Sequence, residues 1–563
     1  MQTFGFPRNV PILACLLSGL ALALTGCASQ GAGVPVTATG SEVSGTTGAP
    51  EAVTCNTITP VVGVLFYGSP SGSDACIYRG IQYATAARWQ PPKVQLTQGG
   101  GNQGNAFGPV CPQESEGSPI GDEQCLYLNV WRKAGTGPKD GKQVMVYIHG
   151  GAFISGSGGS SSGANLFDGS YFAGIGDVIL VTFNYRLGAL GSLFADGMTG
   201  GNYGLMDQEA ALEWVRNNIR TFGGDPLKIM VFGESAGAMS VGLHLMSTPR
   251  AQGRNWRFQS ALMESNPLGL PYKSLSDAKA VGSTFVKKAG PLANLTVSNI
   301  LTAQKKVSGQ YVAAGDLSEM LAWAPSVDGQ TVLSEPMAGK LPLPTVLGTN
   351  RDEGILFAYG ALAKDPSLFD DATYKARLTG MFGATNAARV EALPAYEPKG
   401  DRTRNAGQMS NLINDYMFTC ANADLAGRSA AAQVGPYLYR FTHVPEINLV
   451  AWVVPQCAGK VCHAAELPFV FHDDDGLLGS AAEKTLSANM SGYWSTFAKT
   501  QAPGSSPMPW PAYGATGSYL DLDLSLAAKT DPAILSAANC AFWKSVGYGA
   551  GSMPPARLFR ATE

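Results

Sequence analysis

Short apolar runs recur along the chain and predict buried β-strands. They are too short for ordinary helices and are rich in β-branched residues. The clearest of them occupy residues 143–151, 177–186, 228–235, 345–354 and 436–444. Residues 204–222 and 236–246, which lie between such runs, instead place apolar residues at helical intervals. Strands that alternate with helices predict an α/β fold, in which a large, mostly parallel sheet is covered by helices on both faces.

The same pattern continues to the end of the sequence without a long linker, a repeat of fixed period or a second long apolar span. We therefore expect one large domain over residues 53–563. Charged residues make up only 14% of the chain, the net charge is −3, and no run of lysine and arginine occurs. This composition argues against nucleic acid as a partner.

The N-terminus predicts export. An apolar segment, residues 11–26, follows a single arginine and is short for a membrane-spanning helix, which is typical of a signal peptide over residues 1–26. The segment ends in LTGC, which resembles the lipobox of bacterial lipoproteins, so we expect Cys27 to be acylated rather than to follow an ordinary cleavage site by chance. Residues 27–52, rich in glycine, serine and threonine, are expected to form a flexible tether. Ala28, in place of aspartate, favours the outer membrane as the location of this anchor.

Two serines lie in the pattern Gly-x-Ser-x-Gly, which is typical of an activated nucleophile. With 69 glycines in the chain, one chance match is about as probable as not, so the surroundings must decide. Ser235 follows the apolar run 228–232 and precedes a helical pattern, as a sharp strand-to-helix turn requires. Ser161 lies in a glycine and serine run with neither neighbour, which is typical of a loop. We therefore expect Ser235 to be the nucleophile.

An activated serine also needs donors for the developing oxyanion. The sequence YIHGGAF places Gly150 and Gly151 after a predicted strand, where their amides can turn toward a carbonyl. With the amide of Ala236, which follows the serine, they would form an oxyanion hole of the His-Gly-Gly type.

The general base must be one of five histidines. Where the nucleophile lies on such a strand-to-helix turn, the triad residues follow along the chain in the order serine, acid, histidine. This excludes His149 and His244, which precede any acid after Ser235 that could complete the triad. His443 ends a predicted strand and could be a packing residue, whereas His472 is expected in a solvated loop. His463 is favoured, because it lies in a loop beyond the last predicted strand and is flanked by cysteines.

The acid is expected where residues 345–354 end, and two neighbouring carboxylates lie there. Asp352 and Glu353 are nearly equal candidates, since either could hold the imidazole in the correct tautomer.

Taken together, these stretches resemble the type-B carboxylesterases, the α/β-hydrolase family that includes cholinesterases and bile-salt-activated lipases. The resemblance covers nearly all of residues 53–563 and implies that this part is an α/β-hydrolase catalytic domain. It also implies the triad Ser235, Glu353 and His463, which resolves the choice of acid. The matching stretches are YRGIQYA, RWQPP, EQCLYLNVW, HGGAF, NYRLGALG, GNYGLMDQEAALEWVRNNIRTFGGDP, FGESAGAMS, NRDEG, HAAELPFVF and FAKTQAPG.

An even number of cysteines, eight, remains once Cys15 of the signal and Cys27 are set aside, and in an exported chain this predicts disulfides. Spacing alone does not choose among the pairings. The resemblance implies two of them and leaves the other four cysteines as an N-terminal pair and a pair beside the predicted base: Cys111 with Cys125, Cys420 with Cys540, Cys55 with Cys76, and Cys457 with Cys462.

The chain departs from the family pattern at several positions. The family's Glu-Asp-Cys-Leu and Gln-Ser-Gly read Glu-Gln-Cys-Leu at 123–126 and Glu-Ser-Asn at 264–266. Ser265 is retained and is expected beside the triad. Glu234, next to the nucleophile, is expected near the pocket, where it would either favour cationic groups or make a structural hydrogen bond. Residues 111–125 contain no aromatic residue, which disfavours the choline esters that cholinesterases bind by cation–π attraction.

These features predict a monomeric esterase that acts on small-molecule esters through an acyl-enzyme, needs no cofactor or metal, and meets a membrane only through its lipid anchor. One rival is a catalytically silent, cholinesterase-like binding protein, against which the complete triad and oxyanion positions argue. Another is a haem or metal site at CAGKVCH, residues 457–463, although haem attachment normally needs two residues between the cysteines and here there are four.

Overall fold

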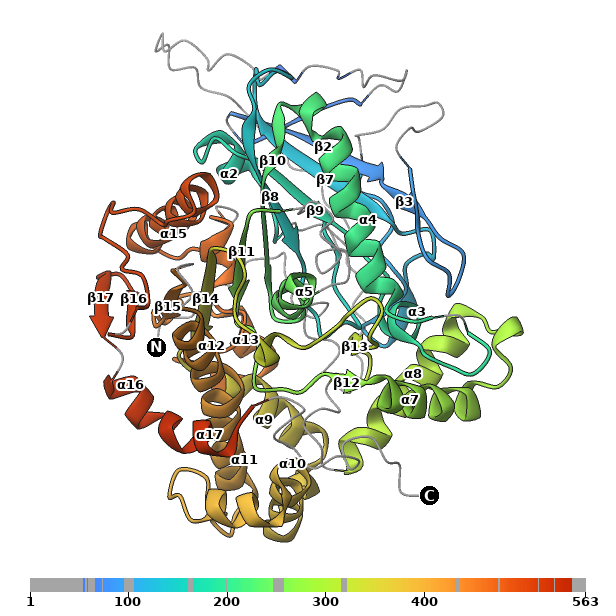
Figure 1. Cartoon of the computed structure of the whole chain (residues 1–563), viewed down its shortest axis with the longest axis vertical. Coiled ribbons are helices and arrows are strands. Elements are labelled where there is room, and N and C mark those ends of the chain that lie inside the picture. Colours follow the sequence, from blue (N-terminus) through green and yellow to red (C-terminus); the bar gives the residue numbers. More distant parts are fainter. Residues whose placement is uncertain are drawn as a thin grey trace, which may run out of the picture.

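A computed structural model describes residues 54–548 with internal gaps (Figure 1). The expected signal peptide, Cys27, the tether and Ser161 lie outside the described residues. The gaps are residues 56–57, 59–65, 73, 96–105, 160–165, 199, 247–257, 315–320, 431–434, 474–475, 515 and 531.

An 11-stranded sheet forms the centre of the molecule. The seven neighbours from β9 to β16 run parallel, and the strands at both edges are antiparallel. This confirms the expected α/β fold with a mostly parallel sheet. The strands, in spatial order, are β1 (Ser69–Ser71), β2 (Ala75–Gln82), β7 (Tyr127–Lys133), β9 (Ile179–Phe183), β8 (Lys142–Ile148), β10 (Gly224–Glu234), β11 (Ser260–Glu264), β14 (Thr345–Asn350), β15 (Tyr437–Phe441), β16 (Ser518–Leu522) and β17 (Ala527–Thr530).

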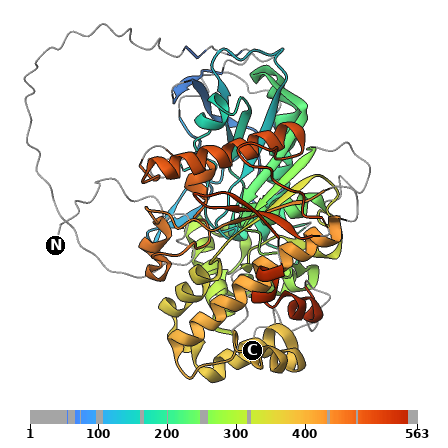
Figure 2. The same ribbon diagram turned by 90° about the vertical axis from the view of Figure 1, so that its left-hand side faces the viewer.

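Helices cover both faces because successive side chains of each central strand point to opposite sides. In β8, Val144, Val146 and Ile148 enter one apolar core, whereas Met145 and Tyr147 enter the other. The first core is completed by α4 (Tyr203–Asn218), α5 (Ala236–Leu245) and α12 (Cys420–Ala430), and the second by α2 (Ser170–Gly174) and α15 (Ala481–Thr500). Figure 2 shows α15 crossing in front of the sheet.

Further helices add two smaller cores beside the sheet. One, around the buried Trp543, is formed by α9 (Gly354–Lys364), α10 (Asp371–Glu391), α11 (Arg402–Leu412), a π-helical turn (Ile413–Thr419) and α17 (Cys540–Val546). The other is formed by α3 (Gly188–Ser192), α7 (Leu275–Ala289) and α8 (Val297–Ala314). The remaining short elements include α13 (Leu449–Val453), α14 (Leu467–Val470), α16 (Pro532–Ala537) and the paired strands β3 (Ala84–Thr85) with β4 (Lys93–Val94), β5 (Gln113–Ser115) with β6 (Ser118–Ile120), and β12 (Lys273–Ser274) with β13 (Ser326–Val327).

Two sequence expectations about strands need correction. The strand before Ser235 is longer than residues 228–232, because β10 begins at Gly224. The loop that carries His463 follows β15 but does not lie beyond the last strand, since β16 and β17 come later in the chain. These two strands were missed because both are short: polar residues interrupt SYLDL, and AAKT, at the edge of the sheet, contains no large apolar residue.

Four disulfides join the eight cysteines in the pairs named above. Cys420–Cys540 links α12 to α17 across 120 residues of sequence, whereas Cys457–Cys462 closes a short loop just before His463. Since the second bridge uses both sulfurs of CAGKVCH, neither is free to bond a haem or a metal while it is intact. Among the described residues, no helix combines the length and the apolar character needed to cross a bilayer.

A buried ion pair fixes the end of β9 to α4. Arg186 Nε and Nη2 each donate to one carboxylate oxygen of Asp207 at 2.8 Å, and the two side chains are 4% and 0% exposed. Both charges are desolvated, so each depends on the other for compensation.

We expect Asp207→Ala to lower the free energy of unfolding by about 3–5 kcal/mol, because it leaves the Arg186 guanidinium buried without its partner. Thermal and urea unfolding followed by circular dichroism would measure this. Asp370→Ala, which removes an exposed partner of Arg402, is the control and should leave unfolding unchanged. Equal effects of the two substitutions would contradict the prediction.

Candidate active site

Ser235 lies on a sharp turn between β10 and α5. Its backbone has φ 55° and ψ −119°, a conformation that costs energy in a residue with a side chain. The turn is possible because its flanks are glycines: a Cβ on Gly237 would overlap the Ile148 carbonyl of β8, and one on Gly233 would lie 2.6 Å from the same oxygen. The Ser235 amide donates to the Glu264 carbonyl at 3.0 Å, which ties the turn to β11. The local structure is therefore that of a nucleophile elbow.

His463 and Glu353 are in direct contact. Their facing atoms, Nδ1 and Oε2, lie 2.7 Å apart, and the side chains are 5% and 0% exposed. The other oxygen of Glu353 accepts from the backbone amide of Asn350 at 2.7 Å. The imidazole also packs against the rings of Phe357 and Phe418, with centroids 4.9 and 5.4 Å away. The acidic partner of this histidine is thus Glu353.

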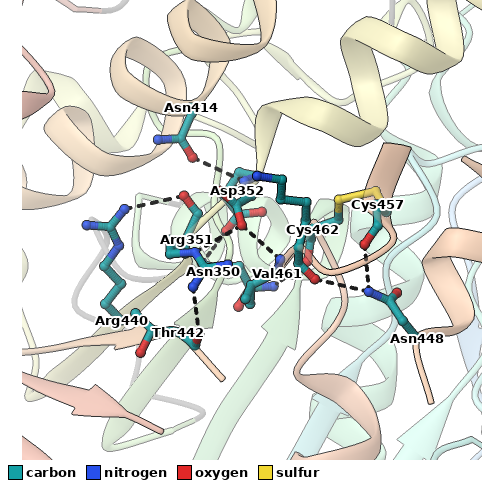
Figure 3. Close-up of polar contacts among 12 residues, drawn as sticks. Asn350, Arg351, Asp352, Asn414, Arg440, Thr442, Asn448, Cys457, Val461 and Cys462 are labelled. Carbon is teal, nitrogen blue, oxygen red and sulfur yellow. Dashed lines mark hydrogen bonds and ion pairs between the residues drawn. A yellow bond between two sulfur atoms is a disulfide. The ribbon is translucent and has the colours of Figure 1, made fainter. Parts of the chain in front are cut away.

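Asp352, the other carboxylate of the pair, faces the loop that carries His463 (Figure 3). Its Oδ2 accepts from the Val461 amide at 2.9 Å, and its own amide donates to the Val461 carbonyl at the same distance. Asn350 Nδ2 donates to the Cys462 carbonyl at 3.0 Å. Residues 350–353 therefore direct the Glu353 carboxylate to the imidazole. Asn350 and Asp352 hydrogen-bond the backbone that directly precedes His463.

Glu234 lies beside the base, closer than the sequence indicated. Its Oε1 is 3.1 Å from His463 Nε2, and its side chain is 4% exposed. Among the described residues, that nitrogen makes no hydrogen bond, to Ser235 Oγ or to any other group. The imidazole is thus flanked by carboxylates on both ring nitrogens.

The surroundings shift the pKa values of both groups. Burial disfavours the charged imidazole, but the charges of Glu234, Glu353 and Glu466 outweigh it and raise the pKa of His463 to about 9. Burial raises the pKa of Glu234 to about 8, although the nearby imidazole opposes this. Glu234 raises the pKa of His463 only while it is itself ionised, so the two groups titrate as a pair.

Two further buried glutamates lie behind the base. Glu466 accepts from Ser265 Oγ at 3.0 Å and from Asn350 Nδ2, and burial raises its pKa to about 7. Glu264 accepts from Trp494 Nε1 at 2.6 Å, and burial raises its pKa well above the usual range. Sequence reasoning placed Ser265 near the triad but missed Glu466, although its position three residues after His463 was a usable signal.

The loop after β8 brings Gly150 and Gly151 to the nucleophile. A Cβ on Gly150 would lie 3.2 Å from the Ser235 Cβ, so the two backbones are in close approach. Among the described residues, none of the amides of Gly150, Gly151 and Ala236 donates a hydrogen bond to a loop or turn carbonyl. Gly151 lies with Ser235 in the lining of one pocket and Ala236 directly follows Ser235, so the oxyanion hole stays a prediction that this close approach supports.

His149 supports this loop and does not act as the general base. Its Nδ1 donates to the Gly150 carbonyl at 2.8 Å, and its ring stacks on Tyr185 with centroids 4.4 Å apart. Burial lowers the pKa of His149 to about 4, so the ring is neutral at pH 7. Tyr185 in turn donates its hydroxyl to the His149 carbonyl at 2.9 Å.

The remaining histidines have structural partners. His443 lies between Glu483 and Asp523, as a packing residue would, and His244 contacts Gln208 at 2.8 Å. The expectation of a solvated His472 was wrong: the residue is half-buried, stacks on Tyr171 and contacts Ser487 Oγ at 2.9 Å. Acidic neighbours in the sequence suggested a solvated loop, but a tyrosine far away in the sequence covers the ring.

A pocket with a cavity volume of about 80 Å³ contains Ser235, His463, Glu234 and Gly151. No lysine or arginine belongs to its described lining. Apart from these residues its walls are mainly aliphatic, and they come from α9, α13, α14, the loop before α13 and the segment before α2: Leu356, Leu449, Val450, Leu467, Ile447 and Leu166.

Known proteins share this architecture. The model of the carboxylesterase family matches residues 61–543. The chain is 34% identical to the para-nitrobenzyl esterase of Bacillus subtilis over 81% of this chain and 92% of that protein, and 32% identical to the bile salt-activated lipase of Rattus norvegicus over 84% and 81%. A solved structure of PNB esterase superposes with a TM-score of 0.72 at 31% identity, covering 86% of this chain and all of that one. Sequence, fold and site agree, and the chain belongs to the carboxylesterase family.

Proposed function

We propose that this enzyme hydrolyses carboxylic esters through an acyl-enzyme, with Ser235 as nucleophile, His463 as general base and Glu353 as its orienting acid. The observation that carries the proposal is the contact of His463 Nδ1 with Glu353 at 2.7 Å in the pocket that contains Ser235. Because a carboxylate on Nδ1 fixes the proton there, Nε2 is left as the basic nitrogen.

The reaction proceeds in two steps of the same kind. Ser235 Oγ attacks the ester carbonyl while His463 Nε2 takes its proton, and the imidazolium then protonates the departing alcohol. Water enters, gives its proton to His463 and attacks the acyl-enzyme. The imidazolium then returns that proton to Ser235 Oγ as its bond to the acyl carbon breaks, which releases the acid and restores the serine and the neutral base. In each step the carbonyl oxygen becomes an oxyanion, which the amides of Gly150, Gly151 and Ala236 would stabilise.

The pocket favours uncharged esters with small apolar groups. Its described walls are mainly aliphatic and hold no lysine or arginine that would pair with a carboxylate substrate. Glu234, next to the nucleophile in the sequence, lines the pocket with its Oε1 3.1 Å from His463, so the imidazole competes with a cationic ester for its charge. A small neutral acyl group is the best match to this chemistry.

We also propose that the enzyme is a monomer, exported and lipid-anchored to the cell envelope, at the outer membrane. The support is the signal-like segment 1–26, the LTGC sequence at Cys27, the following Ala28 and the glycine- and serine-rich residues 27–52 before the catalytic domain.

Ser235→Ala should lower kcat/KM for p-nitrophenyl butyrate by about 10⁴-fold or more, because the acyl-enzyme can no longer form. A fluorophosphonate probe should label the native protein on Ser235, and mass spectrometry of its peptides would locate the label. A native protein that neither hydrolyses the ester nor takes the label would instead be a silent binding protein.

Glu234→Gln should move the acid limb of the kcat/KM profile to lower pH. Catalysis needs a neutral imidazole, so activity rises as pH passes upward through the pKa of His463, and removing the negative charge of Glu234 lowers that pKa. Initial rates from pH 5 to 10 would locate the limb. Glu391→Gln, remote from the pocket, is the control, and an unmoved limb or a shift to higher pH would contradict the assignment.

Cys27→Ser should abolish incorporation of labelled palmitate and release the protein from the membrane fraction, because the thiol is the acylation site. Cys15→Ser, which changes the expected signal peptide, should leave the label intact. Labelling that survives in Cys27→Ser, or that is missing from the native protein, would refute the anchor.

A further inference from the structure

The Cys457–Cys462 disulfide lies between the base and a wall of the pocket. Both cysteines are 0% exposed, and Cys462 directly precedes His463. They form a small apolar cluster with Leu356, Val450 and Val454, separate from the two cores of the sheet. The esterase mechanism gives this bridge no chemical role.

Asn448 joins the disulfide loop to α13. Its Oδ1 accepts from the Ala451 amide at 3.2 Å and so caps the helix. Its Nδ2 donates to the Cys457 carbonyl at 2.8 Å (Figure 3) and to the Lys460 carbonyl at 3.0 Å. Both ends of one amide side chain are therefore used, one for the helix and one for the loop.

The helix itself depends on these contacts for its position. It has only five residues, too few to be stable alone. Leu449 and Val450 line the pocket, whereas Trp452 is 52% exposed, so α13 lies at the surface with packing on its inner side. At its other end, the disulfide loop is held to residues 350–352 through Val461 and Cys462.

We propose that the Cys457–Cys462 disulfide and Asn448 form a clamp that fixes the α13 wall relative to His463 and thereby sets the acyl-chain selectivity of the enzyme. The inference rests on the proposed ester hydrolysis. An aliphatic wall discriminates chain lengths only as sharply as its position is fixed, since a wall that gives way admits additional methylenes. Because the clamp also holds the backbone next to the base, its loss misplaces His463 and slows both acyl-transfer steps.

The test compares p-nitrophenyl acetate with p-nitrophenyl octanoate in the full-length protein, with active sites counted by fluorophosphonate titration. Cys457→Ala/Cys462→Ala removes the bridge. Asn448→Asp keeps the acceptor for the Ala451 amide and removes both donors to the loop. Cys55→Ala/Cys76→Ala, which deletes the disulfide at the N-terminal edge of the sheet, is the matched control.

We expect the octanoate-to-acetate ratio of kcat/KM to rise about fivefold or more in both clamp variants, and kcat for acetate to fall about tenfold in the double cysteine variant. The control should keep the native ratio. A general loss of stability would reduce the number of active sites and leave the ratio per site unchanged, so the ratio separates a clamp from a merely structural bridge.

Each outcome has one reading. Native protein that hydrolyses neither ester contradicts the proposed function. Active native protein with the same ratio in Asn448→Asp overturns the clamp alone, and so does an equal change in the control. If the double cysteine variant does not fold, Asn448→Asp decides, because it leaves the bridge and the cap acceptor in place.

Discussion

One buried imidazole held between two carboxylates is the interaction on which the site depends. Glu353 contacts one nitrogen of His463 and Glu234 approaches the other, and all three groups are withdrawn from water. A desolvated carboxylate is costly unless an opposite charge or hydrogen-bond donors compensate it. The backbone amide of Asn350 donates to Glu353, and Glu234 Oε1 lies 3.1 Å from the imidazole, so a proton on His463 stabilises both carboxylates and has to be removed before the ring can act as a base.

The parallel sheet is what brings these carboxylates together. Parallel strands end at the same edge, and in the register of the sheet Glu234 of β10 is the direct partner of Glu264 of β11, which neighbours Gly348 of β14. Residues 350–353 continue from β14 at that edge. The acid, the nucleophile, Glu234 and Glu264 therefore lie at or just after the ends of three adjacent strands, whereas the base and Glu466 come from the longer loop after β15.

The sequence predicted those site residues whose role is indicated by the residues directly before and after them. Ser235 was distinguished from Ser161 because an apolar run precedes it and a helical pattern follows it. Gly150 and Gly151 were identified by their position directly after an apolar run. Local pattern could not decide between Asp352 and Glu353, because adjacent carboxylates differ only in the direction that the end of β14 gives them. Only a family resemblance favoured Glu353.

Other features of the molecule depend on residues distant in the sequence and were missed for that reason. The partners of Glu466 are Ser265 and Asn350, which come from two other strand ends. Glu234 and His463 are more than two hundred residues apart in the sequence, and the residues around Glu234 give no indication that the two side chains meet. His472 was misjudged in the same way. The strands β16 and β17 were missed because β16 is short and interrupted by polar residues, and because β17, at the edge, need not be apolar.

The link between α12 and α17 has a consequence for how the molecule is made. Trp543 completes the core beside α10 and α11, and Cys540 bonds to Cys420, yet both are supplied only after β17 has been synthesised. The helices from α9 to α11 therefore emerge from the ribosome well before the residues that cover them. Their apolar faces lack the cover of α17 while about the last fifth of the chain is synthesised. This part of the enzyme therefore acquires its final packing only after the chain is nearly complete.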